Sequence, residues 1–298
     1  MYIILLVIII IFLSLIMNKT NKNTKRIQYI GFWGSGEGQK YFTKLLKKYN
    51  HNIKIVDDNP DIIIFSVFNN YHLEDFKKKD RNIKYVFYTG ENAAKNKKPI
   101  VENINLNLTF QNTSVHNNIR YPLWLLYDYD KNKNLEKKNT DNFCCFVYSN
   151  DVKHRNDFCK KLSNYKKVDC GGGSLNNVGG KVKDKLEFQK KYKFCIAYEN
   201  SLQPGYTTEK ILEAYKSNCI PIYYGSETVQ DDFNPDTFIN AHDFKNEDEL
   251  IEYIKKVDTD DELYNSYMNK PVFSKKWLDI FNDPNETFFK NVSQKIVE

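Results

Sequence analysis

Short apolar runs alternate with amphipathic or polar segments over most of the chain. Between Arg26 and about Leu126 the apolar runs are RIQYIGFW, NIKIV, DIIIFSVF and KYVFYTG. A glycine turn, the amphipathic segment QKYFTKLLKKY and a charged helical stretch separate them. Alternation of strands and helices predicts βαβ units around a mostly parallel sheet.

The second half repeats this alternation. FCCFVYS, KFCIAY and CIPIYYG are predicted strands, and helices are predicted near residues 155–163 and 183–191, over ILEAYKSN and around 246–256. The two halves predict an α/β protein of two doubly wound, Rossmann-like domains that face each other across a cleft. Open sheets of this type bind ligands at the carboxyl ends of their strands, so candidate site residues are sought there.

Polar sequence separates the two halves, and aromatic sequence follows the second. Residues 127–142 are lysine-rich, lack apolar periodicity and are interpreted as the linker between the domains. A terminal helix is expected to pack back onto the body through aromatic residues of the tail, which include Trp277, Phe281, Phe288 and Phe289.

The first residues form an uninterrupted apolar segment. Residues 2–17, YIILLVIIIIFLSLIM, carry no charge and would span roughly 24 Å as a helix, just under the thickness of a membrane core. Because no A-x-A-like site follows, an uncleaved anchor is favoured over a removed signal peptide, and a buried core helix is the remaining alternative. The predicted organisation is an anchor and basic stem over 1–23, a first Rossmann-like domain with the linker over 24–140, and a second Rossmann-like domain with the terminal helix over 141–298.

Length, composition and charge indicate a globular chain of two domains and argue against a role in binding nucleic acid. The 298 residues are enough for two domains of roughly 150 residues, and 41% hydrophobic with 28% charged residues is typical of a globular chain. The net charge of +6 owes four charges to the first 26 residues, which contain no acid. The rest is nearly neutral, which argues against a nucleic-acid-binding protein.

The six cysteines do not follow a metal-binding pattern. Cys144 and Cys145 are adjacent in a predicted strand, and no C-x-x-C spacing occurs. Free buried thiols are the first interpretation and disulfides the second, while a zinc site is remote.

A glycine-rich turn follows the first strand. Gly34 to Gly38 read GSGEG, and Asp57 and Asp58 close the next strand 23 and 24 residues after Gly34. This layout resembles a dinucleotide-binding turn and leaves an NAD-dependent oxidoreductase as a rival hypothesis. The spacing is G-x-G-x-G, however, so the third glycine is expected to be misplaced for packing of helix against strand, and a structural glycine loop is favoured.

Acidic residues at two places in the first half could carry chemistry. Glu91 directly follows the strand YVFYTG, at an edge where a carboxylate can act as a general base, although a loop carboxylate or helix cap is the ordinary alternative. Asp128 and Asp130 could form a metal-binding pair, but they open the lysine-rich linker, and no metal site is predicted.

The segment KFCIAYENSLQPGYTTEKILEAYKSNCIPIYYGS is the richest candidate site. Its strand leads to Asn200, and Thr207 or Thr208 is expected to cap a helix whose first turn carries Glu209 and Lys210. Free amides and the positive end of a helix dipole favour an anion such as a diphosphate, to which Lys210 adds a full charge. A capped helix that begins with a Glu–Lys pair is also common without any ligand.

The order of these residues resembles a known family. ENSLQPGYTTEKILEAY followed by IPIYYGS is similar to the donor-binding signature of the α1,3-fucosyltransferases, glycosyltransferase family 10. The resemblance extends to FCCFVYSN with Arg155, to the GGGS loop, to residues 231–244 and to FYTGEN, and covers about residues 84–256.

The resemblance implies a GT-B fold and an inverting transfer of L-fucose from GDP-fucose to a sugar hydroxyl, without a strict need for metal. Glu91 matches the family's proposed base, and Arg155 and Lys210 match cations that neutralise the diphosphate. The remaining matches to nucleotide and fucose contacts are Ser149, Asn150, Asn200, Tyr206 and Glu209.

Acceptor and location follow less directly from the resemblance. The family implies O3 of GlcNAc in a glycan, but AAKNKKPI after Glu91 departs from its patterns, and Tyr198 stands where Phe is usual. The family also implies the Golgi or secretory lumen, whereas Lys19, Lys22 and the basic residues after them favour a cytosolic body. A transferase for another GDP-sugar is the nearest rival, and a glycan-binding membrane protein without turnover is a further one.

Overall fold

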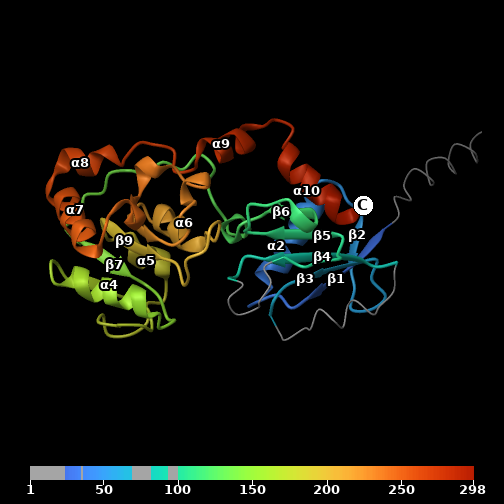
Figure 1. The fold of residues 1–298 in the computed structure, drawn as a ribbon, viewed down its shortest axis with the longest axis horizontal. Coiled ribbons are helices and arrows are strands. Elements are labelled where there is room, and N and C mark those ends of the chain that lie inside the picture. Colours follow the sequence, from blue (N-terminus) through green and yellow to red (C-terminus); the bar gives the residue numbers. More distant parts are fainter. Residues whose placement is uncertain (1–23, 35, 69–81, 93–99) are drawn as a thin grey trace, which may run out of the picture.

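The structure is a computed structural model that describes residues 24–34, 36–68, 82–92 and 100–298 (Figure 1). The predicted anchor over 2–17 and the charged helical stretch within 69–81 lie outside the described residues. In the part of the chain that is described, no helix has the length and apolar character needed to cross a membrane.

The first half forms a six-stranded parallel sheet in the order β2-β1-β3-β4-β5-β6. Its strands are β1 Lys25–Ile30, β2 Ile53–Ile55, β3 Ile62–Phe65, β4 Lys84–Thr89, β5 Leu106–Thr109 and β6 Asn118–Arg120. Helix α2, Glu37–Lys48, follows β1, and the 3-10 helices η2, Val115–Asn117, and η3, Leu123–Leu126, flank β6. We call this sheet with its covering helices the N-terminal lobe.

The second half forms a five-stranded parallel sheet in the order β11-β10-β9-β7-β8. Its strands are β7 Cys144–Phe146, β8 Val168–Cys170, β9 Phe194–Tyr198, β10 Ile220–Tyr224 and β11 Ile239–Asn240. The α-helices that accompany it are α4 Lys153–Ser163, α5 Lys185–Gln189, α6 Glu209–Lys216, α7 Glu247–Thr259 and α8 Asp261–Ser266. Three 3-10 helices lie around β11, namely η4 Val229–Asp231, η5 Pro235–Thr237 and η6 Ala241–Asp243. We call this unit the C-terminal lobe.

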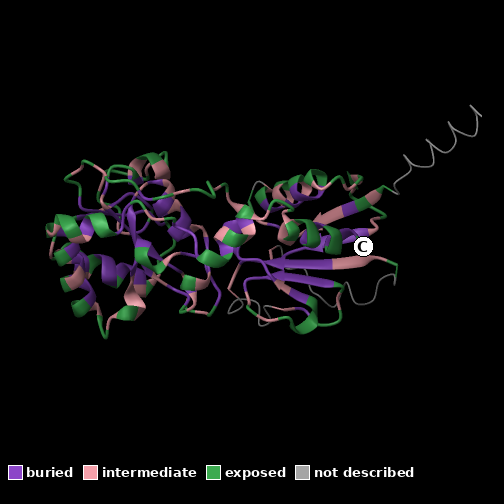
Figure 2. Ribbon diagram, turned by 90° about the horizontal axis from the view of Figure 1, so that it is seen from above, coloured by how far each residue is buried: buried purple, intermediate pink, exposed green. Residues whose placement is uncertain are grey.

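The predicted parallel α/β architecture is confirmed. Strands β3, β5, β7 and β9 are buried along their whole length (Figure 2), since side chains on both faces of each sheet belong to apolar clusters. The continuous apolar runs of the sequence reflect this two-sided burial. Strands β5, β6, β8 and β11 were not predicted from the sequence, and each has only two to four residues.

The last helix returns to the N-terminal lobe. After α9, Lys275–Asn282, the chain enters α10, Thr287–Val297, which lies beside α2 and β6 (Figure 1). The Phe288 ring stacks on Tyr121 at 6.0 Å, and the Tyr49 hydroxyl donates to Glu286 at 3.1 Å. The aromatic tail therefore packs onto the body through a terminal helix. This helix follows the second half in sequence but packs against the N-terminal lobe.

The segment interpreted as the linker is anchored at several points. Leu135 is fully buried, and its carbonyl accepts from the Asn269 amide at 2.8 Å. The Lys133 carbonyl accepts from the Val272 amide at 3.0 Å. One buried apolar side chain and two backbone hydrogen bonds thus fasten this polar segment to the C-terminal lobe.

The third glycine of the glycine-rich turn packs against an aromatic side chain. A Cβ on Gly38 would lie 2.5 Å from the Phe32 ring, so the third glycine does allow helix α2 to approach the segment after β1. The space is filled by an aromatic side chain and not by the strand backbone, so Gly38 does not have the helix-against-strand packing role of the third glycine in G-x-G-x-x-G.

All six cysteines are free and buried. They lie in the two apolar layers of the second sheet, and the Sγ atoms of Cys159 and Cys170 are 3.5 Å apart. Burial raises the pKa of Cys144 well above its ordinary value. This thiol is therefore an apolar core group and not a thiolate nucleophile.

Candidate functional site

One pocket between the two lobes contains all the predicted site residues. Its volume is about 300 Å³. The eight predicted residues in its lining are Glu91, Ser149, Asn150, Arg155, Asn200, Tyr206, Glu209 and Lys210. The other six are Trp33, Phe68, Leu123, Tyr127, Tyr148 and Thr208. Most of them follow the carboxyl end of a strand, which is where an open parallel sheet places its ligands.

Glu91 enters the pocket from the N-terminal lobe. It stands two residues after the end of β4, and its amide donates to the Thr89 hydroxyl at 3.0 Å. Gly90 is required between them, because a Cβ there would lie 2.5 Å from the Leu123 side chain. The strand end and this close approach together fix the position of the Glu91 backbone at the pocket.

Lys210 enters the pocket from the first turn of α6 and forms an ion pair with the buried carboxylate of Glu199. Its Nζ lies 3.0 Å from Glu199, which is fully buried, and 3.4 Å from Glu209. Burial disfavours the charged lysine, but the two carboxylates outweigh it and raise the pKa of Lys210. Lys210 therefore stays charged in the neutral range and can meet an anion.

Glu199 organises this end of α6. Its carboxylate accepts the Thr208 amide at 2.8 Å and contacts the Thr208 hydroxyl at 2.9 and 2.7 Å. Thr208 is the N-cap residue, as predicted, but its hydroxyl bonds Glu199 instead of a helix amide. Gly225 makes room for this carboxylate, since a Cβ there would lie 2.5 Å from the Glu199 side chain. No role was predicted for Glu199 from the sequence, although its place before Asn200 in the strand-end motif was a usable signal.

Glu209 carries negative charge beside Lys210. Burial acts to raise its pKa, but Lys210 and then Lys185 outweigh that effect and lower it below the ordinary value. A carboxylate at this position can accept hydrogen bonds from hydroxyl groups of a bound sugar.

Arg155 supplies the second cation of the pocket from helix α4. Nη1 donates to the Asn200 side-chain oxygen at 2.5 Å and Nη2 to the Asn150 carbonyl at 2.7 Å. Burial of the side chain lowers its pKa from the ordinary value, which is so high that the guanidinium stays charged. Two of the predicted residues, Asn150 and Asn200, therefore hold a third one in place.

Tyr206 closes the pocket between Phe110 and the start of α6. Its ring contacts Phe110 edge to face at 5.4 Å, and burial raises the pKa of the phenol. The preceding Gly205 has φ +81° and donates its amide to the Ser226 hydroxyl at 2.8 Å. A neutral phenol on a fixed loop can donate a hydrogen bond to a ligand oxygen.

Ser149 and Asn150 are exposed at the end of β7, beside the glycine loop that follows β8. A Cβ on Gly172 would lie 2.0 Å from the Tyr148 carbonyl oxygen, and one on Gly173 would lie 3.3 Å from Ser149. The GGGS loop thus passes directly over the strand end that carries the two small polar residues.

An aromatic wall on the N-terminal side of the pocket was not predicted from the sequence. Trp33 and Phe68 lie 5.7 Å apart, and Tyr127 lines the same pocket. Trp33 follows β1 and Phe68 follows β3, so the rule that ligands bind at strand ends could have identified both. The three side chains are half-buried, and aromatic faces beside polar groups are suited to the apolar faces of sugar rings.

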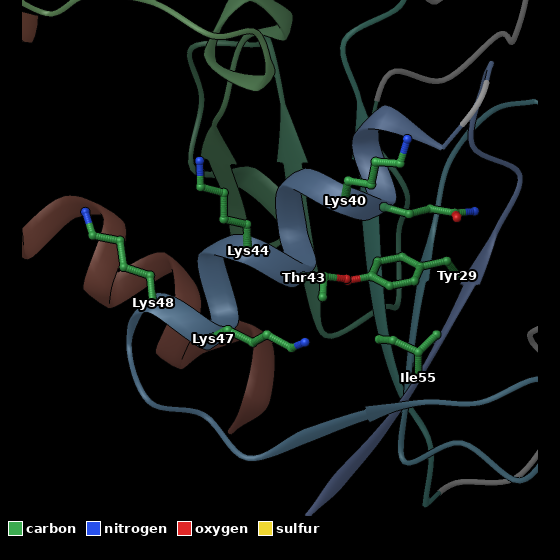
Figure 3. Close-up of a pocket in the computed structure, with 8 residues that line it drawn as sticks. Tyr29, Lys40, Thr43, Lys44, Lys47, Lys48 and Ile55 are labelled. Carbon is green, nitrogen blue, oxygen red and sulfur yellow. The ribbon is translucent and has the colours of Figure 1, made fainter.

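The other candidate sites lie elsewhere. Asp128 and Asp130 do not line the pocket, and among the described residues no group of three potential metal ligands occurs. A larger cavity of about 710 Å³ lies along α2, where Lys40, Lys44, Lys47 and Lys48 line it with Tyr29 (Figure 3). It contains none of the predicted site residues, and its lining includes the amide side chain of Gln39 but no carboxylate.

Sequence profiles of one family match both lobes. "Alpha-(1,3)-fucosyltransferase FucT N-terminal domain" matches residues 27–127, and "Glycosyltransferase family 10 (fucosyltransferase) C-term" matches residues 135–279. The chain belongs to glycosyltransferase family 10.

Individual members of glycosyltransferase family 10 match parts of the chain. An α-(1,3)-fucosyltransferase of Helicobacter pylori is 48% identical over 123 residues, which is 41% of this chain and 26% of that protein. The α-(1,3)-fucosyltransferase B of Drosophila melanogaster is 36% identical over 143 residues, 42% of this chain and 32% of that protein. The matched segments thus span about a quarter to a third of these relatives.

Solved structures of the family match over a longer span. A crystal structure of an α1,3-fucosyltransferase with GDP-fucose has a TM-score of 0.69 and 28% identity, and covers 91% of this chain and 90% of that one. A structure with GDP has the same TM-score with 27% identity and covers 92% of each chain. The fold of both lobes, and their arrangement, is therefore that of the family.

Proposed function

We propose that the protein transfers L-fucose from GDP-fucose to a hydroxyl group of a sugar with α1,3 linkage. The observation that carries this proposal is the single pocket in which Glu91 of one lobe meets Arg155 and Lys210 of the other. The likeness to an α1,3-fucosyltransferase solved with GDP-fucose supports the choice of donor.

The geometry supports an in-line displacement. The Glu91 carboxylate accepts the proton of the attacking hydroxyl, while Arg155 and Lys210 stabilise the charge that develops on the leaving diphosphate. Fixed cations of this kind act where the charge appears and need no reorganisation during the reaction. With both lysine and arginine charged at neutral pH, the pocket itself supplies the charge that a metal ion supplies in other transferases.

The other predicted residues are assigned to the donor. Tyr206 donates to an oxygen of the donor, and Glu209 accepts from sugar hydroxyls and stabilises positive charge on the ring. Asn200 and Asn150 hold Arg155, and Ser149 contacts the nucleotide. The exposed place of Ser149 and Asn150 at the end of β7 supports this assignment.

The acceptor is assigned to the N-terminal side. We propose O3 of GlcNAc in a glycan, as in the family that the chain resembles. The aromatic wall of Trp33, Phe68 and Tyr127 supports a sugar acceptor, because aromatic faces pack against the C–H faces of sugar rings. This wall lies on the same side of the pocket as Glu91, where an activated hydroxyl must lie.

A transfer assay tests the proposal. The full chain, solubilised in detergent, is incubated with labelled GDP-fucose, GlcNAc-terminated and Galβ-GlcNAc acceptors, with and without EDTA. Fucosylated product that persists in EDTA supports both the reaction and the metal-independent mechanism. A folded protein that neither binds, hydrolyses nor transfers from GDP-fucose contradicts the donor assignment, and competition with other GDP-sugars then identifies the donor.

We further propose that residues 2–17 anchor the protein in a membrane. The proposal rests on the sixteen uncharged residues of that segment and on the basic residues after it. Carbonate extraction of membranes from expressing cells tests it. The full chain is expected in the pellet and a chain of residues 24–298 in the supernatant. Extraction of both would contradict an anchor.

A further inference from the structure

Tyr148 contacts two cations with one ring. The Cζ atom of Arg155 and the Nζ atom of Lys185 each lie 4.5 Å from the centroid of the Tyr148 ring. Both distances are well inside the range in which a cation is attracted to an aromatic face. Tyr148 lines the candidate site at the end of β7, directly before Ser149.

The two cations differ in their other partners. Lys185 forms an ion pair with Glu213 at 2.5 Å, so its charge is compensated. In the described part of the chain, Arg155 forms no ion pair with a carboxylate, and its guanidinium donates to the neutral oxygens of Asn150 and Asn200. These bonds fix the edge of the guanidinium, while the Tyr148 ring supports its face. Its charge thus remains available for an anionic ligand.

The Tyr148 ring is itself held firmly. Its carbonyl accepts from the Ser174 amide at 2.9 Å, and the closeness of Gly172 to the same carbonyl prevents the backbone from moving toward the glycine loop. Phe146 supports the ring edge to face at 5.1 Å. The hydroxyl is buried without a hydrogen-bond partner, so the aromatic face, and not the hydroxyl, makes the useful contact.

We propose that Tyr148 is a positioning residue that holds the Arg155 guanidinium flat and oriented for the diphosphate of the donor. This inference rests on the proposed function of the same pocket. An arginine that is oriented before the donor binds loses less side-chain freedom on binding, and its planar fork meets two phosphate oxygens at once. Tyr148 acts through Arg155 and needs no contact with the donor.

Substitutions that keep or remove the ring test this role. Tyr148→Phe keeps the face and is expected to change kcat/KM for GDP-fucose by less than about threefold. Tyr148→Leu removes the face and is expected to lower it about tenfold, which corresponds to a partly desolvated cation–π contact. Tyr264→Leu is the matched control, because Tyr264 is also buried with an unpartnered hydroxyl and a lysine near its ring, far from Arg155 in sequence and outside the pocket.

A double-mutant cycle distinguishes positioning from general structural support. If Tyr148 acts through Arg155, Tyr148→Leu lowers kcat/KM by less than about twofold when Arg155→Gln is already present. A merely structural role would give the same additional loss in both backgrounds. Should the leucine variant not fold, Tyr148→Met, with a flexible apolar side chain, takes its place in the cycle.

The outcomes separate the inference from the proposed function. A wild-type protein that does not bind GDP-fucose contradicts the proposed function, and the same cycle in unfolding free energy then tests whether the ring still couples to Arg155. With an active wild type, the inference is overturned by unchanged kinetics of Tyr148→Leu, by equal losses in the Phe and Leu variants, or by additivity with Arg155→Gln.

Discussion

Arg120 and Asp232 form a buried, two-bond ion pair that joins the lobes. Nη1 and Nη2 of Arg120 donate to the two carboxylate oxygens of Asp232 at 2.6 and 2.7 Å. Arg120 ends β6 in the N-terminal lobe, and Asp232 directly follows η4 in the C-terminal lobe. Trp277 also donates to Asp232 at 2.9 Å, and Arg120 reaches the Gly205 carbonyl at 3.3 Å. The contact between the lobes is therefore linked to the loop that carries Tyr206.

Removing one charge of this pair is expected to destabilise the protein strongly. Asp232→Asn leaves the Arg120 guanidinium buried without a counter-charge, and such a loss costs about 3–5 kcal/mol. Burial acts against the charged arginine, while Asp232 raises its pKa, so Arg120 cannot escape the cost by losing its proton. Urea unfolding of the wild type and the variant measures the difference.

The exposed pair of Arg26 and Asp61 provides the control for that experiment. Its Nη2–Oδ1 distance is 2.9 Å, but the two side chains are 46% and 36% exposed. Asp61→Asn is expected to cost less than about 1 kcal/mol, because water screens the pair. Similar losses in Asp232→Asn and Asp61→Asn would show that burial of the interlobe pair has no energetic consequence.

Glu91→Gln tests the proposed base. The amide keeps the size of the side chain but cannot take the proton of the acceptor, so turnover is expected to fall more than about 100-fold. GDP binding, measured by calorimetry, is expected to change little, because the diphosphate contacts lie in the other lobe. Glu227→Gln, at an exposed position outside the pocket, is the control. Near-normal turnover of a folded Glu91→Gln protein would remove Glu91 from this role.

The sequence predicted most of the elements that carry the site. Apolar runs bounded by polar turns located β4, β7, β9 and β10, because strands covered on both faces have no polar positions to obscure the pattern. The position of Glu91 and Asn200 after such runs placed them at strand ends. The same rule did not reveal β6 or β8, since their sequences NIR and VDC contain polar residues and do not form a continuous apolar run.

Contacts between distant segments could not be predicted from local pattern. Glu199 looked like one residue of a loop motif, whereas its role depends on Thr208, Lys210 and the missing Cβ of Gly225. Arg120 carried no signal at all, because its partner lies 112 residues away in the other lobe. The roles of such residues depend on how the sheets stack, which no periodicity of one segment records.

The pair of Lys210 and Glu199 is expected to give a variant whose stability depends on pH. In the wild type the pKa of Lys210 is raised above its ordinary value of 10.5, so the lysine is charged throughout the neutral pH range. Its contribution to stability therefore persists over that range. Lys210→Met removes this cation, and burial then raises the pKa of Glu199 further above 4.5. The folded variant holds a proton that the unfolded chain releases, so its stability falls as pH rises above about 4.5, by up to about 1.4 kcal/mol per pH unit.

Urea unfolding at pH 5 and pH 8 measures this dependence. The difference between wild type and Lys210→Met is expected to be larger at pH 8. Adding Glu199→Gln to the variant should remove the dependence, because no buried carboxyl remains to titrate. Equal destabilisation at both pH values would contradict a buried, uncompensated carboxylate at Glu199.

Gly205→Ala is expected to disturb the loop that positions Tyr206. At φ +81° an alanine lies in the left-handed region, which destabilises the folded state by about 1–2 kcal/mol. Its Cβ would also lie 2.4 Å from the Phe110 carbonyl oxygen. Gly179→Ala is the matched control, because Gly179 has φ +85° but nothing within 4 Å of its Cβ position. Both variants share the backbone penalty, so their difference in unfolding free energy and in KM for GDP-fucose reports the contact with Phe110. We expect Gly205→Ala to lose more in both measurements, since Phe110 also supports the Tyr206 ring; equal effects would mean that the loop can move away from Phe110 without cost to the donor pocket.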